Sequence, residues 1–304
     1  MVKRILLVGA GNRLEACAHR CDALGIAAHS CELPPDSPDL DRVLEAASHA
    51  SVSGIYPTDV EFAATAFAAG CRMGLPVPPC VGQAGAWRAL WSRLLSLQGR
   101  CEDALLLAHD GAAEDPPDQF GMPCWVRPVG ALAGTTCARV EAAPDLGLRI
   151  AQAQRHSTDQ CALVQRASSG EAWRVLGFKF GPSYVPIEAL EETHTDGLFR
   201  IASSLTVHGE VRASNYVAAV ELSRNVAPYL PGGYGLLEFE IVFVQSEQGD
   251  PPRPRLADLR IRPVVEPAVE VLLRETLGID LLEDALRVAV GIRPVAAACQ
   301  GLSG

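Results

Sequence analysis

The sequence predicts a mixed fold: a small parallel α/β unit, then a larger α+β part whose strands are mostly antiparallel. Over residues 1 to about 80, short apolar runs that end near glycine alternate with helical patterns, as in parallel strands with crossover helices. Residues 236–244 and 256–263 alternate polar and apolar side chains, which is typical of paired antiparallel strands. Amphipathic helices are predicted at about 266–276 and 281–290.

The composition fits a globular protein and argues against two classes of function. The chain has 304 residues, 48% of them hydrophobic, yet no apolar run reaches the ~18 residues that indicate a membrane span. The formal net charge of −10 argues against a general nucleic-acid binder. The N-terminal stretch MVKRILLVGAGN has no signal-peptide cleavage pattern, so it is predicted to form the first strand.

The cysteines indicate a cellular compartment and give no sign of a metal site. Ten are scattered along the chain without a Cys-x-x-Cys pair, which suits a reducing cytoplasm better than a disulfide framework. Cys17 and Cys21 lie one helical turn apart but have no second ligand pair nearby, so buried or free thiols are favoured over a metal site.

Two glycine-containing turns each leave an alternative open. Gly9-Ala-Gly11 follows the first strand, but Leu14 stands where a dinucleotide fingerprint needs a third glycine, and a tight turn is favoured. Glu32 is the nearest candidate for a ribose-binding acid. A second turn, between a strand at 124–127 and a returning strand CARVE, has small and hydroxyl residues that suit phosphate binding or an ordinary hairpin.

The stretch LADLRIRP is an unusually charged strand. Period-two alternation places Asp258, Arg260 and Arg262 on one face. The preceding strand, LLEFEIVFV, presents Glu238 and Glu240 on one of its own faces. Either a cross-strand ion-pair ladder or the floor of an active site explains this pattern. The apolar face of LADLRIRP is expected to carry Ala257, Leu259 and Ile261.

The order of these parts resembles the ATP-grasp superfamily, and the resemblance covers nearly the whole chain. It implies a Rossmann-like pre-ATP-grasp domain at residues 1–82 and an ATP-grasp fold at residues 83–304. Within the latter it implies a hairpin lid at about 100–163 and a C-terminal subdomain at about 164–304. Members typically clamp ATP between two subdomains and join a carboxylate to an amine or thiol through an acyl-phosphate.

The resemblance assigns the phosphate contacts to arginines. Arg88 and Arg127 stand where the family has two ATP-contacting lysines, in a chain that has only two lysines. Arg127 is also a candidate catalytic residue. Arginine and lysine side chains both bind phosphate, although a planar guanidinium can donate two parallel hydrogen bonds whereas an ammonium acts as a point charge. The lid's glycine and hydroxyl pattern is matched by Gly134, Thr135 and Thr136.

The resemblance also implies the nucleoside and metal contacts. Gln165 lies on the strand that would line adenine, and Glu171 is a candidate ribose contact; Trp87 and Arg166 replace acids of the family pattern. For magnesium, the implied ligands are Glu240, with Glu238 as the alternative, and Asp258. Arg262 matches the family's arginine and is the second catalytic candidate. Arg260 departs from the pattern, because it puts a fixed positive charge where an asparagine ligand is usual.

Three functions follow as hypotheses. The first is a ligase that uses ATP and Mg²⁺ in small-molecule biosynthesis, with nucleotide and small carboxylate and amine substrates as its partners. The second is a degenerate relative that binds nucleotide or a small anion without catalysis. The third binds a metabolite without ATP. For all three, the cysteines, the net charge and the lack of a long apolar run predict a cytoplasmic protein with no nucleic-acid or membrane partner. The oligomeric state is left open, with a homodimer as the alternative to a monomer.

Overall fold

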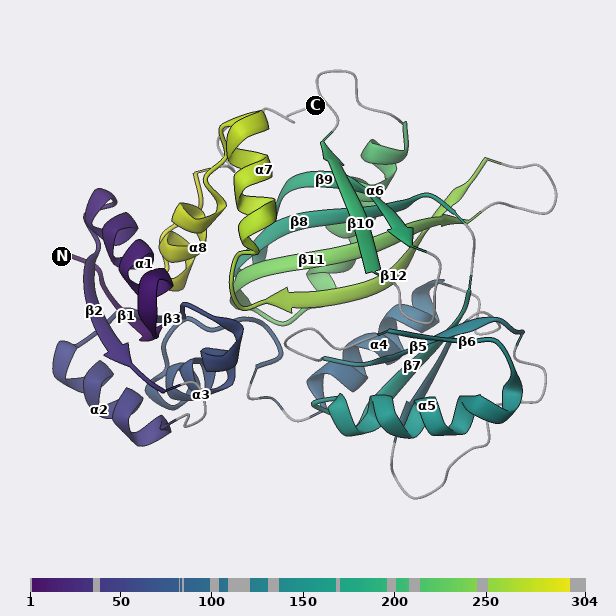
Figure 1. Cartoon of the computed structure of the whole chain (residues 1–304), viewed down its shortest axis with the longest axis horizontal. Coiled ribbons are helices and arrows are strands. Elements are labelled where there is room, and N and C mark those ends of the chain that lie inside the picture. Colours follow the sequence, from purple (N-terminus) through teal and green to yellow (C-terminus); the bar gives the residue numbers. More distant parts are fainter. Residues whose placement is uncertain are drawn as a thin grey trace.

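The chain forms an N-terminal α/β unit and two further β-sheets with their helices (Figure 1). The computed structural model describes residues 2–34, 39–81, 83, 85–98, 104–108, 121–130, 137–167, 170–195, 201–207, 214–244 and 251–295. None of the helices within these ranges combines the length and the apolar character needed to cross a membrane.

The N-terminal unit has a three-stranded parallel sheet in the order β2-β1-β3, as the sequence predicts. The central strand β1 is buried at every position after its first, which explains its continuous apolar sequence. Cys17 and Cys21 are buried free thiols in the core beneath this sheet, in agreement with their expected role. The elements are β1 (Arg4–Gly9), α1 (Gly11–Ala23), β2 (Ala27–Glu32), α2 (Leu40–Ala50), β3 (Gly54–Pro57), the 3-10 turn η1 (Val60–Phe62) and α3 (Ala63–Met73).

Close packing explains the Gly-Ala-Gly turn after β1. A Cβ atom at Gly9 would lie 1.7 Å from Oγ1 of Thr58, so only glycine fits there. Thr58 is buried and donates a hydrogen bond from its hydroxyl to the carbonyl of Val8. Gly11 has φ of +63°, a left-handed conformation that glycine adopts without strain. These contacts support the tight-turn interpretation.

A four-stranded antiparallel sheet with strand order β4-β7-β5-β6 forms the second unit. The predicted hairpin is present as β5 paired with β6. Helix α5 packs on one face of the sheet, and α4 packs against residues of the other face, such as Leu163. The elements are α4 (Ala86–Gln98), β4 (Ala104–Ala108), β5 (Cys124–Pro128), β6 (Ala138–Val140), α5 (Ala143–His156) and β7 (Cys161–Arg166).

The third unit is a five-stranded antiparallel sheet in the order β10-β9-β8-β11-β12. Leu237, Phe239 and Ile241 of β11 pack beneath α6, so the glutamates between them point to the opposite face. Strands β4, β9 and β10 were not predicted from the sequence. The elements are β8 (Ala172–Gly181), β9 (Ser183–Thr195), β10 (Ile201–Val207), α6 (Ser214–Val226), the 3-10 turn η2 (Ala227–Tyr229), β11 (Gly233–Val244) and β12 (Arg253–Arg262).

One detail of the predicted β12 alternation is wrong. Beyond the pairing of Asp258 with β11, the register skips Ala257 and continues at Leu256. This β-bulge reverses the alternation at one step. Leu256 therefore joins Leu259 in the core beneath α6, whereas Ala257 lies in a separate small cluster.

Helices α7 (Pro267–Leu277) and α8 (Leu281–Ala289) lie between the N-terminal unit and the five-stranded sheet (Figure 1). Their apolar side chains share a core with β1, α1 and the end of β11. Arg20 of α1 adds an ion pair with Asp280, with 3.0 Å between Nη1 and Oδ2. Arg13 donates to the carbonyl of Val265. These contacts fix the N-terminal unit against the segment that follows β12, namely Val265 and helices α7 and α8.

Candidate functional site

Charged side chains gather where the β11–β12 hairpin faces the four-stranded sheet. Arg127 of β5 is 3% exposed, and its Nη1 lies 3.1 Å from Oδ2 of Asp258 and 3.4 Å from Oε2 of Glu240. Three of the predicted site residues, from two different sheets, are thus in direct contact. The pocket beside them is lined by Arg127, Pro128, Gly130, Cys137, Asp258, Leu259 and Arg260.

Arg260 is the centre of this arrangement. Its Nε lies 2.6 Å from Oδ2 of Asp258, its Nη2 lies 3.3 Å from Oε2 of Glu240, and its Nη1 lies 3.5 Å from Oε1 of Glu238. The strand register sets these contacts, because Glu238 lies opposite Arg260 and Glu240 lies opposite Asp258. One guanidinium therefore contacts three carboxylates, and the cross-strand ladder that the sequence allowed is present.

Arg262 and Arg174 complete the arrangement around Glu238. Arg262 makes a bidentate pair with Glu238, with Nε and Nη2 at 2.7 and 2.8 Å from its two oxygens. Arg174 of β8 has Nη1 at 3.7 Å from Glu238 and Nη2 at 2.6 Å from Glu192 of β9. Its Nη1 also lies 3.2 Å from Glu266, just before α7. We refer to this group as the charged cluster; its members are Arg127, Arg174, Arg260, Arg262, Glu192, Glu238, Glu240 and Asp258.

Sequence reasoning missed Arg174 and Glu192. A signal for Arg174 was available, because it is a single charge inside the otherwise apolar stretch AWRVLGF, where an unpaired charge would be costly. Glu192 lies in β9, which was not predicted, so its partner could not be named. Cys137, which lines the pocket, was also missed; burial raises the pKa of its thiol to about 11, so the thiol is protonated at neutral pH.

The surroundings of the charged cluster change the pKa values of its carboxylates in opposite directions. Burial alone would raise the pKa of Glu238, but the guanidinium groups around it, Arg262 and Arg174 foremost, bring that pKa below its usual value. Burial prevails at Glu192 and raises its pKa. Asp258 is the main reason that the pKa of Arg260 lies well above the usual arginine value. Arg260 is therefore a permanent cation.

The carboxylates that the family resemblance assigns to magnesium do not fit that role here. Mg²⁺ requires near-octahedral oxygen ligands at about 2.0–2.1 Å. Glu238, Glu240 and Asp258 instead direct oxygens at the nitrogens of Arg260. Among the described residues, no group of three acids, histidines or cysteines is arranged to hold a metal ion.

Other predicted contacts surround the cluster or lie outside it. Gln165 is 3% exposed, and its Nε2 donates to the carbonyl of Leu256 over 3.4 Å, which ties β7 to β12. Glu171 accepts hydrogen bonds from Asn215 Nδ2, at 2.9 Å, and from the indole of Trp173. Gln165 thus borders the hairpin, whereas Glu171 is held at the start of α6.

Arg88 and the two replaced acids have separate surroundings. Arg88 has an exposed side chain on the first turn of α4, and its backbone N–H donates to Asp159. Trp87 is buried, and its ring lies where a Cβ at residue 130 would be, which explains the glycine there. Arg166 is exposed at the end of β7. Gly134, Thr135 and Thr136 lie outside the described residues.

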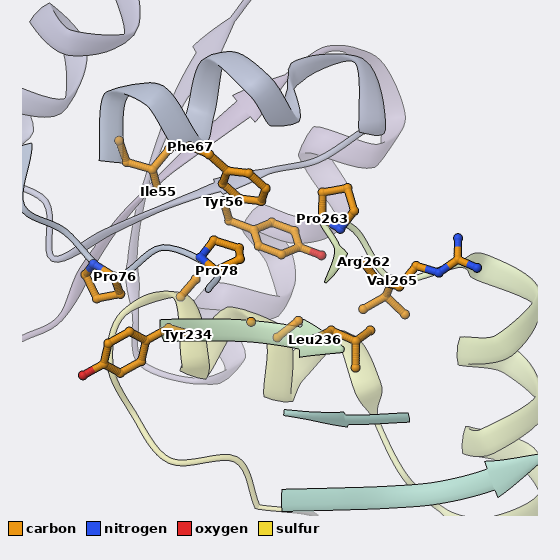
Figure 2. Close-up of a pocket in the computed structure, with 13 residues that line it drawn as sticks. Ile55, Tyr56, Phe67, Pro76, Pro78, Tyr234, Leu236, Arg262, Pro263 and Val265 are labelled. Carbon is orange, nitrogen blue, oxygen red and sulfur yellow. The ribbon is translucent and has the colours of Figure 1, made fainter. Parts of the chain in front are cut away.

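A second, mostly apolar pocket lies between the N-terminal unit and the five-stranded sheet. Figure 2 shows Ile55, Tyr56 and Phe67 on one side and Tyr234 and Leu236 on the other. Arg262 also lines it, so this pocket borders the charged cluster. Its volume of about 30 Å³ has room for about two water molecules.

Comparison with known proteins identifies the fold. No protein-family model and no curated protein sequence matches this chain. An L-amino acid ligase from Bacillus licheniformis superposes with a TM-score of 0.69 at 14% identity, over 96% of this chain and 78% of that one. A phosphoribosylglycinamide synthetase from Anaerococcus prevotii gives 0.61 at 11% identity, over 99% and 78%. An N5-carboxyaminoimidazole synthase from Aspergillus clavatus, solved with ADP and 5-aminoimidazole ribonucleotide, gives 0.64 at 13% identity, over 97% and 78%.

These proteins are ATP-grasp ligases, and the chain has the ATP-grasp fold. The resemblance seen in the order of the sequence elements is thereby confirmed for the fold. At identities of 11–14%, these superpositions establish the architecture of the chain and not its activity.

Proposed function

We propose that this protein is an ATP-dependent ligase that joins a carboxylate to an amine or thiol through an acyl-phosphate. The observation that carries the proposal is the contact of Arg127, from the lid sheet, with Glu240 and Asp258 of the β11–β12 hairpin. Such a junction of two sheets, in an ATP-grasp fold, is where a nucleotide's phosphates would be clamped. We further propose that the chain has two domains, a pre-ATP-grasp domain at residues 1–82 and an ATP-grasp domain at residues 83–304.

In the proposed reaction, a carboxylate oxygen attacks the γ-phosphorus of ATP and ADP leaves. The amine or thiol then attacks the acyl carbon and inorganic phosphate leaves. Arg127 and Arg262 would neutralise charge on the transferring phosphoryl group, since phosphoryl transfer depends mostly on positioning and electrostatics. Gln165 would meet adenine and Glu171 the ribose. Arg88 and the loop of Gly134, Thr135 and Thr136 would add phosphate contacts from the lid.

A specific observation favours a second candidate, a nucleotide or anion binder without catalysis. Arg127, Arg260 and Arg262 are each engaged by carboxylates of the hairpin, so groups that would act on phosphate already have protein partners. A cytoplasmic location is proposed for either candidate. It is supported by eight free thiols in the described part of the chain.

The two candidates differ in product formation. ATP binding is measured by calorimetry, and ADP release is then followed with a panel of carboxylates and amines, with hydroxylamine present to trap acyl-phosphate. Binding with carboxylate-dependent ADP release and hydroxamate formation supports the ligase. Binding without turnover over the whole panel supports the second candidate. Absence of binding at millimolar ATP contradicts both.

Two variants locate the site. Arg127→Met should weaken ATP binding by about tenfold or more, because one cation at the phosphates is lost. Arg127→Lys, which restores the charge, should recover most of the affinity. The matched control is Arg253→Met, an exposed arginine on β12, which should bind ATP like the unmodified protein. Equal loss in Arg253→Met would argue against a site at Arg127.

A further inference from the structure

We propose that Arg260 is a built-in cation that replaces a divalent metal at the β11–β12 hairpin. A phosphate-bearing ligand would then bind at this site without a divalent ion. The inference rests on the proposed nucleotide site for its second part only. Its first part, the exclusion of a metal ion, concerns the hairpin by itself.

The contacts of Arg260 are those of a shared cation. Oxygens of Asp258, Glu240 and Glu238 lie 2.6, 3.3 and 3.5 Å from three different nitrogens of the one guanidinium. A hard divalent ion would need these oxygens at about 2.0–2.6 Å around a single point. The guanidinium occupies the space that such an ion would require. Because arginine stays protonated, its charge is permanent and cannot be removed by a chelator.

The charge around Arg260 also opposes a second cation. A further cation, Arg127, shares Asp258 and Glu240 with Arg260. Arg262 and Arg174 also contact Glu238. Each carboxylate of the hairpin is therefore contacted by at least two guanidinium groups, and a divalent ion added here would be repelled by all of them.

Exposure shows what kind of ligand the cluster can accept. The side chains of Arg260 and Arg262 are 33% and 24% exposed, whereas those of Glu238 and Glu240 are 3% and 7% exposed. The guanidinium groups of Arg260 and Arg262 are therefore the most accessible charges of the cluster, and the carboxylates of the hairpin, including Asp258 at 12% exposed, lie beneath them. Beside the cluster, Glu266, which pairs with Arg174, is 46% exposed. Anionic oxygens of a phosphate group would meet guanidinium nitrogens directly, in the geometry that arginine favours.

The first test uses Mn²⁺ alone, which takes the same hard oxygen ligands as Mg²⁺. Electron paramagnetic resonance detects the unbound ion, so a loss of its signal reports binding. The unmodified protein should not bind Mn²⁺ at this site. Arg260→Asn, which removes the charge and supplies an oxygen, should bind Mn²⁺ at least about tenfold more tightly. Arg260→Lys retains a cation and should behave like the unmodified protein, as should the control Arg253→Asn, which makes the same change at an exposed position of β12.

Tight Mn²⁺ binding by the unmodified protein, removed by Asp258→Asn, would overturn the inference. So would equal Mn²⁺ affinities for the unmodified protein and a folded Arg260→Asn. If Arg260→Asn does not fold, the unmodified protein and Arg260→Lys decide the question, since both are expected to leave Mn²⁺ free.

The second test compares ATP binding in excess Mg²⁺ and in EDTA. For the unmodified protein, the ATP affinities in Mg²⁺ and in EDTA should agree within about twofold. Arg260→Asn should bind ATP about tenfold more weakly in EDTA than in Mg²⁺. A tenfold Mg²⁺ requirement in the unmodified protein would overturn the inference and leave the proposed ATP site intact. Absence of ATP binding in both buffers would contradict the proposed function, and the Mn²⁺ result would still decide the role of Arg260.

Discussion

Two charged regions of this protein use the same residue types in different surroundings. At the junction of α1 and α8, Arg20 pairs with Asp280 and Glu283 at 3.0 and 3.4 Å, with side chains 18–32% exposed. In the charged cluster, Glu238 is 3% exposed and is contacted by three arginines. The arginines Arg20, Arg260 and Arg262 are similarly exposed, and the regions differ in their carboxylates: Asp280 and Glu283 are partly open to water, whereas Glu238 is not. Similar distances therefore imply different energies, because water screens the carboxylates of the first region more than Glu238.

The largest expected effect comes from removing a charge in the buried region. Glu238→Gln should lower the free energy of unfolding by about 3–5 kcal/mol at neutral pH, since it leaves the buried guanidinium of Arg174, and the partly exposed ones of Arg260 and Arg262, without their shared counter-charge. Urea unfolding measures the change. The control is Glu275→Gln, at an exposed position of α7, which should stay within about 0.5 kcal/mol of the unmodified protein. Similar losses in both variants would contradict the distinction between the two regions.

The second effect is a pH dependence that should disappear with Glu238. The folded-state pKa of Glu238 lies below the ordinary 4.5, so the unfolded chain takes up its proton first as the pH falls. The stability due to Glu238 is therefore complete above about pH 4.5 and is lost as the pH falls toward its lowered pKa. Urea unfolding of the unmodified protein and of Glu238→Gln should show a difference in stability that narrows below pH 4.5. A constant difference would mean that the pKa is not lowered.

A carboxylate that binds backbone groups should have an intermediate effect. Asp159 accepts hydrogen bonds from the backbone N–H groups of Gly85 and Arg88, at 3.1 and 2.9 Å, and so caps α4 from a distant part of the chain. Asp159→Ala should cost about 1 kcal/mol in thermal or urea unfolding and speed amide exchange in the first turn of α4. Asp159→Asn retains an acceptor and should cost less; an equal cost would show that the hydrogen bonds are not what matters.

The smallest effect is expected at the partly exposed pair of Arg20 and Asp280. Arg20→Met keeps an extended side chain and should change the free energy of unfolding by less than about 1 kcal/mol. The change should shrink further in high salt, because exposed charges are screened. A cost of several kcal/mol would show that this junction, and not only the charged cluster, depends on its ion pairs.

Local patterns predicted much of the fold. The alternation of strands and helices identified β1 to β3 with α1 to α3, and the period-two pattern identified β11 and β12 with their charged faces. Strands β9 and β10 were missed. β9 contains Pro186 and three glutamates, which mask the usual strand pattern, although the long pairing of β8 with β9 stabilises the strand in the folded chain.

The sequence alone determined which side chains share a face of a strand, because side-chain direction alternates with a fixed period along the backbone. It thereby placed Arg260 and Arg262 beside the glutamates of the partner strand. Only the tertiary structure decided which charges meet, since strand register and the packing of one sheet on another are long-range properties. Arg127 meets Asp258 from another sheet, Arg174 reaches Glu238 from a neighbouring strand, and a bulge at Ala257 ends the simple alternation. For these reasons only the folded chain could show that the guanidinium of Arg260 contacts three carboxylates.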